Sequence, residues 1–512
     1  MGRVATLPAP MSGRLPSDTI RTAPHRRWLA ALLSFVIPGL GQAYGGRWRI
    51  AIIFMTPVLA LVAVVAGTLA GPLTQVREAL FAREVLTAVL VGNGVLLAWR
   101  GLAIADAGLT PWGRLEGRSR RTTLAVVGGL LVTSVAMHVW IGALVVQLDA
   151  TLEQVFSPED EDGVVAAPPD PSGTTGPAPE EPEEPTPPAW DGTDRINLLL
   201  LGTDAAPGRE VALSDVVLVV SVDPAEKTAV MISVPRDTAR LPLPDTRLFA
   251  DAIYPDRVNS IMARAAAEPE AWCPTLVAAD PGPACGLRMI ESVIGLYLGI
   301  QIHHHAVVDM AGFAEMIDAI GGVHLCLPGR LVDPEFDSTI SDRHADGLVL
   351  QAGCADYDGV DALAYARSRK GWIEMPDGTI DGQSDFDRAE RQQRVLLAMR
   401  TELGQADTII ELPGLLSAIG RTVSTDVERS EAAGLASLLP LIAGLEIERV
   451  VLGYPNYVDV PPDAETNYVL LPRRAAIRER MASIFGPTEL EGWYLGTDDA
   501  GPSAPSAAAP GS

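Results

Sequence analysis

Three long apolar runs lie in the first 148 residues, near 50–70, 80–99 and 122–147. Each approaches the roughly 20 residues that an α-helix needs to cross about 30 Å of hydrocarbon. The third run contains one histidine and no charged residue. We therefore expect residues 1–148 to hold a cytoplasmic N-terminus and a membrane module of three transmembrane helices. No short apolar stretch with a small-residue cleavage site precedes them, so a cleaved signal peptide is not expected.

An earlier apolar run, Trp28–Tyr44, is short and contains Pro38, Gly39 and Gly41. We interpret it as an interfacial or re-entrant element. It resembles the start of small helical-hairpin membrane modules with a PGLGQ-x-Y-x-G signature. The alternative is a fourth full span.

Charge predicts the orientation. Residues 1–148 carry 14 arginines, no lysine and five acidic residues (+9), whereas the remainder carries 25 basic and 59 acidic residues (−34). Arginines before the first run and between the second and third runs should be cytoplasmic. Three spans then place the rest of the chain outside the cell, and four would place it inside. The net charge of −25 argues against a nucleic-acid partner.

All four cysteines follow the apolar runs, as expected of an oxidising exterior. Four cysteines allow three pairings. We favour Cys273–Cys285 and Cys326–Cys354 because each closes a local loop. Zinc binding by these cysteines is the disfavoured alternative, since no CxxC pair is present.

Composition divides the rest of the chain. Residues 149–193 are rich in Pro and Glu and should form a disordered linker. Residues 194–487 should form a globular region, with 404–487 as a C-terminal extension packed on or continuing the domain at 194–403. Residues 488–512 should be a disordered tail.

The globular region alternates strand and helix signals, which indicates an α/β domain with a central mixed sheet between helices. Strands are predicted at 196–201, 216–222, 228–234, 305–309 and 323–327, and helices at 287–298, 312–320, 358–365 and 385–403.

Polar residues follow or precede the predicted strands, where ligands of open α/β sheets usually bind. Asp204 follows the first strand, Asp215 opens the second, and Arg236 follows the third. Paired carboxylates such as Asp204 and Asp215 could hold Mg²⁺, or alternatively Mn²⁺, bridging to a pyrophosphate.

Further arginines occur in compact motifs: Arg257 in RVN, Arg367 and Arg369 in YARSR, and Arg388 and Arg391 in DFDRAERQQ. Asp385, Arg388 and Gln392 fall on one helical face. In extended chain, residues two apart point the same way, as we expect for YARSR. Guanidinium groups bind phosphate in bidentate fashion, so the set suggests a diphosphate clamp. Alternatively, each arginine pairs with a surface carboxylate.

Other catalytic signatures are missing. The sequence has no GxxxxGK[ST] loop and no GxSxG elbow. His303, His304 and His305 suggest a metal site, but consecutive strand residues point to opposite faces, so we favour a structural role.

Seven motifs in order resemble the LytR-CpsA-Psr family of cell-envelope phosphotransferases over residues 194–403. They are NLLLLGTD, LSD, SVPRDT, RVN, VVDMAGFAEMIDAIGGV, DGVDALAYARSR and DFDRAERQQ.

The resemblance implies a mixed sheet flanked by helices, with an apolar tunnel for a polyprenyl chain. Residues near Phe313, Met316 and Ile317 would line the tunnel or pack in the core. The implied reaction moves a glycopolymer from a polyprenyl pyrophosphate at the membrane to a peptidoglycan hydroxyl, and releases polyprenyl phosphate.

The resemblance also implies residue roles. Asp204 and Asp215 would hold Mg²⁺, and either could be the base. Arg236, Arg367 and Arg369 would bind the pyrophosphate and act in catalysis. The substrate-binding set adds Arg257, Asp385, Arg388, Arg391 and Gln392.

The chain also departs from the family. Arg257 replaces the usual lysine, the following glycine-rich segment is absent, the loop at 370–384 is long, and the membrane part exceeds one helix. Residues 404–487 extend beyond the resemblance. Two alternatives stay open: a non-catalytic polyprenyl-phosphate-binding scaffold, and a polyprenyl-pyrophosphate hydrolase.

Overall fold

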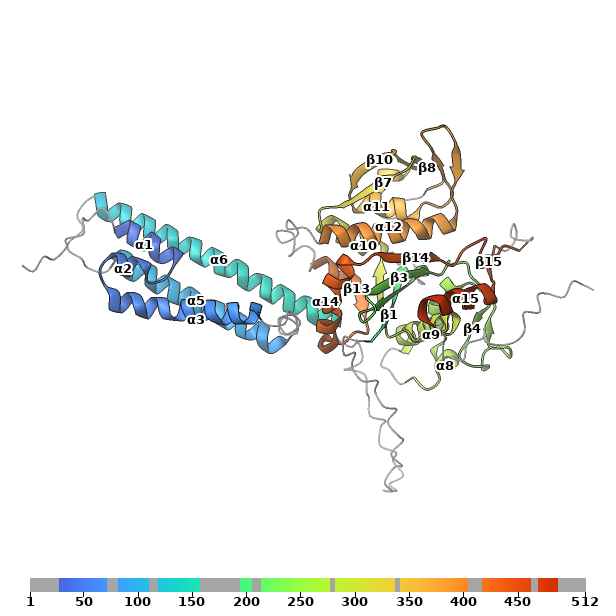
Figure 1. Cartoon of the computed structure of the whole chain (residues 1–512), viewed down its shortest axis with the longest axis horizontal. Helices are drawn as coiled ribbons and strands as arrows, with labels where there is room; N and C mark the ends of the chain where they lie inside the picture. Colours follow the sequence, from blue (N-terminus) through green and yellow to red (C-terminus); the bar gives the residue numbers. More distant parts are fainter. Residues whose placement is uncertain are drawn as a thin grey trace, which may run out of the picture. The chain divides into compact units, whose positions relative to one another are not determined.

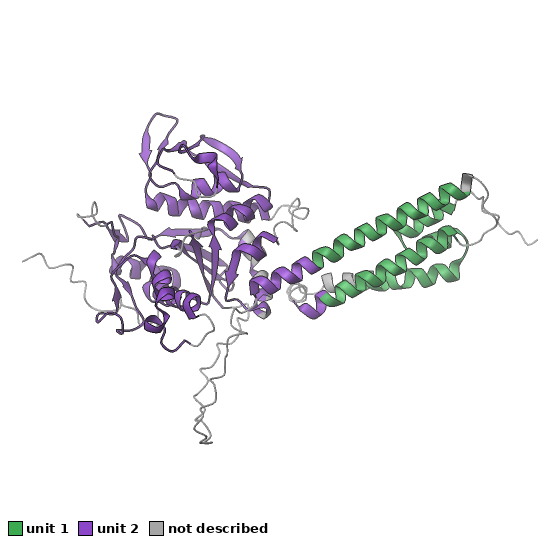
Figure 2. Cartoon of the chain, turned by 180° about the vertical axis from the view of Figure 1, so that it is seen from behind, with its two compact units in different colours: residues 1–72, 87–145 green, residues 73–86, 146–512 purple. Residues whose placement is uncertain are grey.

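A computed structural model describes residues 27–70, 82–109, 118–156, 194–204, 213–276, 281–336, 341–403, 417–461 and 468–486. Most of the predicted linker and the whole predicted tail lie outside these residues. The chain separates into two compact units, shown in green and purple in Figure 2. The first comprises residues 1–72 and 87–145, and the second comprises residues 73–86 and 146–512.

The first unit is helical. Its helices are α1 (Arg27–Val36), α2 (Leu40–Tyr44), α3 (Trp48–Ala70), α5 (Arg83–Leu109) and α6 (Arg118–Phe156), of which α5 and α6 run into the second unit. Two of these, α5 and α6, are long and apolar enough to cross a membrane by length and composition alone. The first expected span, near 50–70, coincides with α3. Its described side chains form a shorter apolar stretch, Trp48–Val64.

The PGLGQ segment forms a sharp break between α1 and α2. Gly39 has φ of 103°, which is accessible to glycine at little cost. A Cβ at Gly41 would lie 1.9 Å from the Ala30 carbonyl oxygen, so the two helices approach as only glycine permits. The buried Gln42 donates to the Ala103 carbonyl (2.9 Å) and to Asp106 (3.0 Å). At about 15 Å, α1 is too short to span a bilayer by itself.

A six-stranded mixed sheet is the centre of the second unit (Figure 1). Its order is β13 (Val423–Thr425), β6 (His304–Asp309), β1 (Ile196–Thr203), β2 (Ser214–Asp223), β3 (Thr228–Ser233) and β14 (Ile447–Val451). β1 pairs parallel with β6 and antiparallel with β2, and β14 pairs parallel with β3. The expected mixed sheet is thereby confirmed.

Both faces of this sheet are covered. Alternating residues such as Leu199, Val219 and Ile232 pack against α7 (Ile261–Ala267), α9 (Pro281–Leu298) and α15 (Arg474–Phe485). Ile196, Val222 and Ala229 pack against Leu438 of α14 (Arg429–Gly444), in a separate cluster. On the same side, Gln393 of α12 (Asp385–Leu403) hydrogen-bonds Ser233 of β3 and the Val450 carbonyl of β14.

A second core lies beyond α12, at the top of Figure 1. It contains α10 (Met310–Ala319), α11 (Gly359–Arg367), the pair β7 (Val323–Leu327) and β10 (Gly353–Tyr357), and a sheet in the order β12 (Ile380–Gly382), β11 (Trp372–Glu374), β8 (Arg330–Asp333) and β9 (Leu348–Leu350). The long loop at 370–384 is thus a hairpin of β11 and β12.

The remaining elements are short: β4 (Leu241–Pro242), β5 (Ile253–Tyr254), η2 (Val258–Ser260), α8 (Pro269–Trp272), η3 (Asp342–His344), β15 (Val458–Asp459) and β16 (Leu471–Pro472). The structure contains both favoured disulfides, Cys273–Cys285 and Cys326–Cys354.

Candidate functional site

Strand direction gathers the predicted acidic and basic residues at one edge of the sheet. β1 ends there, β2 starts there, and β3 ends there, because β2 is antiparallel to both neighbours. Asp204 follows β1, Asp215 is the second residue of β2, and Arg236 lies three residues past β3. The N-terminus of α12 brings Asp385 and Arg388 to the same place.

Arg236 lies at the centre of this cluster. Its Nη1 donates to Asp215 Oδ1 at 2.5 Å, and its Nε is 3.8 Å from Asp385 Oδ1. Burial lowers the pKa of Arg236, but attraction to Asp215, Asp385 and Asp237 more than offsets it, so the pKa is raised overall.

Arg388 completes the cluster from α12. It is only 5% exposed. Its Nη2 lies 3.1 Å from Asp385 and donates to the Asp215 backbone carbonyl at 3.4 Å. Burial is the main cause of its lowered pKa.

Two buried nitrogens of this cluster lack hydrogen-bond partners within the described residues: Nε of Arg236 and Nε of Arg388. A buried N–H without an acceptor costs about 1–3 kcal/mol, more when charged. Such donors fit an anion with several oxygens, for which guanidinium is well shaped.

Asp237, next to Arg236 in SVPRDT, is a further acidic group in this cluster. Its Oδ1 is 3.5 Å from Arg257 Nε and its Oδ2 is 3.7 Å from Arg236 Nε. Burial is the main cause of its raised pKa and Asp385 adds to the rise, whereas Arg236, Arg257 and Arg388 oppose it. Asp237 follows the third predicted strand beside Arg236, so its position near the site was expected from the sequence, but no role was assigned to it.

The YARSR motif spans the end of α11 and the turn after it, and buried side chains stabilise this turn by hydrogen bonds. Arg367 is the last residue of α11, and Ser368 and exposed Arg369 follow it. The extended-chain expectation for the two arginines is therefore wrong for Arg367, which is helical. The guanidinium of Arg367 lies over the Phe336 ring, 5.7 Å from its centroid.

The carboxylate of Asp333 fixes this turn through three hydrogen bonds. It is 2% exposed, and its Oδ2 accepts from Ser368 Oγ (2.8 Å) and from the backbone N–H groups of Arg369 (3.2 Å) and Lys370 (3.3 Å). The sequence around Asp333 does not predict its contacts, because its partners lie more than 30 positions later in the chain.

Arg391 and Gln392 are placed against the same turn, and the structure does not bring them into the Arg236 cluster. Arg391 is 2% exposed and donates to the carbonyls of Tyr365 (2.8 Å) and Ser368 and to Gln383. Burial lowers its pKa to about 10. Gln392 Nε2 donates to the Ala366 carbonyl at 3.4 Å.

The C-terminal part also contacts this site. Arg257 Nε donates to the Tyr468 carbonyl at 3.0 Å, and Leu470 N–H donates to the Asp237 carbonyl at 2.9 Å. Burial, with Asp385 and Asp237 nearby, raises the pKa of Tyr468. Because the sequence analysis gave residues 404–487 no role, it missed this segment.

The two carboxylates at this end of the sheet suit a Mg²⁺ ion that also binds the substrate phosphates. Asp204 and Asp215 lie at the same ends of paired strands, and Asp204 Oδ1 is oriented by the Leu213 N–H at 2.8 Å. Two carboxylates are too few to hold Mg²⁺ alone. Mg²⁺ is usually bound by one or two carboxylates together with substrate phosphates and water.

Comparisons with known proteins agree with the motifs. The LytR_cpsA_psr family matches residues 174–475, more than half of the chain. The match continues well past residue 403, so ending the resemblance there was wrong. The strands β13 and β14, which complete the sheet, lie inside the matched range.

Curated relatives carry transferase names. The polyisoprenyl-teichoic acid–peptidoglycan teichoic acid transferase TagU of Halalkalibacterium halodurans is 26% identical over 236 residues, covering 46% of this chain and 62% of the relative. TagV of Bacillus subtilis, named for the same activity, is 25% identical over 278 residues, covering 52% of this chain and 61% of the relative. The chain thus spans less than two thirds of either relative.

Among solved structures, B. subtilis TagV aligns with 57% of this chain and 96% of its own, with 21% identity and a TM-score of 0.41.

Proposed function

Since the chain belongs to the LytR-CpsA-Psr family, we propose that it transfers a glycopolymer from a polyprenyl pyrophosphate to a peptidoglycan hydroxyl. A phosphodiester forms between glycopolymer and peptidoglycan, and polyprenyl phosphate leaves. The names of TagU and TagV support a transferase of this class.

One observation carries the proposal at the residue level. Arg388 is buried and Arg236 is partly buried, both lie beside Asp385, and each has a buried Nε without a hydrogen-bond acceptor within the described residues. A pyrophosphate bound between them would supply acceptor oxygens to both. Asp215, Asp237 and Asp385 form ion pairs with these two arginines before substrate binds.

The chain's own residues would have separate tasks. Arg236 and Arg388 would bind the pyrophosphate and stabilise charge that develops on the transferring phosphoryl group. Arg257, Arg367 and Arg369 would contact outer phosphate oxygens. Asp204 or Asp215 would accept the proton of the attacking hydroxyl as its oxygen bonds to phosphorus and the bond to polyprenyl phosphate breaks.

Mg²⁺ is the proposed cofactor, with Mn²⁺ as a possible substitute, held by Asp204 and Asp215. When bound, it would neutralise charge on the pyrophosphate oxygens. An apolar tunnel for the polyprenyl chain remains part of the proposal.

The location is proposed as well. The first unit would anchor the chain in the cell membrane through several passes, with the N-terminus in the cytoplasm. The second unit would then face the exterior, where peptidoglycan lies. The two disulfides are consistent with an oxidising exterior.

A matched pair of substitutions tests the reaction. Arg236→Lys keeps the positive charge but removes the planar fork, so we expect kcat/KM to fall about 100-fold. Arg394→Lys alters a half-buried arginine of α12 that pairs with Glu390, and should leave the rate within about twofold. Transfer is measured with purified full-length chain, a polyprenyl-pyrophosphate glycan, peptidoglycan and MgCl₂.

Product analysis separates the alternatives. Glycan attached to peptidoglycan through a phosphodiester supports transfer. Free phosphoglycan without attachment would identify a hydrolase. Bound polyprenyl phosphate with no turnover would identify a scaffold, and equal rates for Arg236→Lys and the unaltered chain would remove Arg236 from the reaction.

A further inference from the structure

A second cluster of titratable side chains lies at the opposite edge of the six-stranded sheet. It forms at the start of β6, where His304 and His305 lie, whereas the Arg236 cluster lies where β1 ends. Glu291 reaches it from α9, Asp426 from the residue after β13, and Glu431 from the first turn of α14.

Sheet register places Asp426 beside the histidines. β13 pairs antiparallel with β6, and Thr425 faces Ala306. The next residue, Asp426, therefore lies beside His305. The His305 backbone N–H donates to Asp426 Oδ1 at 2.7 Å and orients this carboxylate.

The atoms lie close enough together to share one metal ion. His305 Nδ1 is hydrogen-bonded to Glu291 Oε1 at 2.8 Å and lies 3.4 Å from Asp426 Oδ1. Bonds of about 2.1 Å at tetrahedral angles would separate two ligands by about 3.4 Å. The three ligand atoms all lie within 4.8 Å of one another.

His304 and Glu431 support the other side of Asp426. His304 Nδ1 is 3.6 Å from Asp426 Oδ2, and His304 Nε2 is 3.6 Å from Glu431 Oε2. The Nδ1 atom of His304 is buried and has no hydrogen-bond partner within the described residues.

The charges are unbalanced. Within the described residues, every ion pair of Glu291, Asp426 and Glu431 is made to one of these two histidines. The three carboxylates outnumber the two imidazoles, so the cluster keeps a net negative charge even with both imidazoles protonated. Glu291 and Glu431 are partly buried and Asp426 is exposed, and a divalent ion would balance the excess negative charge.

We propose that His305, Glu291 and Asp426 bind a divalent transition-metal ion. One imidazole with two carboxylates suits Zn²⁺ or Mn²⁺ better than Mg²⁺, which prefers oxygen ligands throughout. The ion joins α9, β6 and the chain between β13 and α14, and so fastens the C-terminal part to the sheet. Its role is structural and is independent of the proposed transfer reaction.

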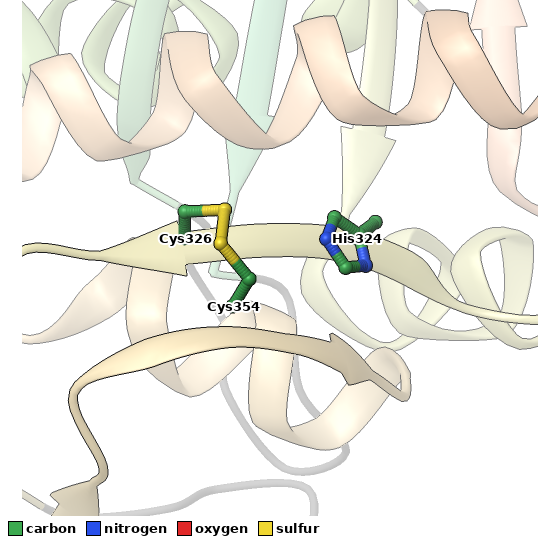
Figure 3. Close-up of side chains that lie close together, drawn as sticks. All are labelled: His324, Cys326 and Cys354. Carbon is green, nitrogen blue, oxygen red and sulfur yellow. A yellow bond between two sulfur atoms is a disulfide. The ribbon is translucent and has the colours of Figure 1, made fainter.

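The structure offers a comparison site that should not bind metal. His324, Cys326 and Cys354 also lie close together, with His324 and Cys326 on β7 and Cys354 on β10 (Figure 3). Their sulfurs are joined in a disulfide, so no thiolate ligand is available. His324→Ala is therefore the matched control for a histidine substitution.

The test uses full-length chain in detergent, purified through a tag without histidine and stripped with EDTA. Titration with ZnCl₂ at pH 7 should give about one bound ion per chain and a higher Tm. Asp426→Asn and Glu291→Gln, which change charge but little volume, should each weaken Zn²⁺ binding more than about tenfold and reduce the Tm increase. His305→Ala should behave likewise, and His324→Ala should bind as the unaltered chain does.

Two results would overturn the proposal. One is equal Zn²⁺ and Mn²⁺ binding by the unaltered chain and Asp426→Asn. The other is an unaltered chain that binds neither ion while its Tm falls as pH rises from 5 to 8, which would mean that protonated histidines balance most of the charge.

Discussion

At the scale of single residues, the site depends on polar groups whose partners are distant in sequence. Asp204, Asp215 and Arg236 could be predicted because each lies next to a strongly apolar strand. Asp333 and Tyr468 could not, since only the folded chain brings them to YARSR and to Arg257. Arg391 was predicted from its motif, but its helix directs it to backbone carbonyls.

Asp333 should matter for both stability and activity. Asp333→Ala removes the acceptor of three hydrogen bonds and leaves buried donors without partners, so we expect a loss of about 2 kcal/mol in the free energy of unfolding. Transfer should slow because Arg367 and Arg369 lose their fixed turn. Urea unfolding and kinetics check this. Ser368→Ala removes one of these bonds and should cost less; an equal cost would contradict the assignment.

Asp237 should make stability depend on pH. Its pKa is raised above 3.8 in the folded chain, mainly by burial, so the folded state binds more protons and stability falls as pH rises through this range. Asp237→Asn removes that loss. The Tm difference, variant minus unaltered chain, should therefore become more positive from pH 4 to pH 7.

Asp245→Asn is a control for which the Tm difference should change with pH in the opposite direction. A hydrogen bond from Arg247 lowers the pKa of Asp245, so its contribution to stability is present above its ordinary pKa and lost in acid. The Tm difference should become more negative as pH rises from 3 to 5. Parallel slopes for the two variants would refute the interpretation of Asp237.

At the scale of elements, runs of β-branched residues predicted β2 and β3 within about two residues, and the helical spacing of 385–403 predicted α12. β13 and β14 were not predicted. They are short, and their strand conformation depends on pairing with β6 and β3, which local propensity does not report.

The C-terminal elements should be required for folding. A chain ending at residue 403 would lack β13, β14, α14 and α15, which would expose an edge of β3 and the apolar faces that α14 and α15 cover. We expect it to aggregate or to show no cooperative thermal transition by circular dichroism. A chain ending at residue 487 should melt like the full chain; equal melting of both truncations would contradict this expectation.

At the scale of the whole molecule, the division into a helical unit and an α/β unit follows from composition and charge, which is why it could be predicted. The number of spans could not be decided the same way. Short apolar segments such as Trp28–Tyr44 fit several membrane arrangements, and their backbone path depends on close contacts such as that at Gly41.

Topology gives the prediction at this scale. With three spans, protease added outside intact protoplasts should degrade the second unit, whereas an epitope at the N-terminus should survive until the membrane is permeabilised. Immunoblotting for both ends checks the result. A protected second unit would favour four spans and would place the arginine site in the cytoplasm, away from peptidoglycan.

The hydrogen bonds that join Tyr468 and Leu470 to Arg257 and Asp237 have a consequence for the order of events in the cell. These residues come more than 250 positions after Asp204, which lies at the same edge of the sheet. During synthesis, Asp204 therefore leaves the ribosome long before Tyr468 and Leu470 are added to the chain. The contacts that Tyr468 and Leu470 make with the site therefore form only after residue 470 has been synthesised, well after Arg388 has completed the arginine cluster.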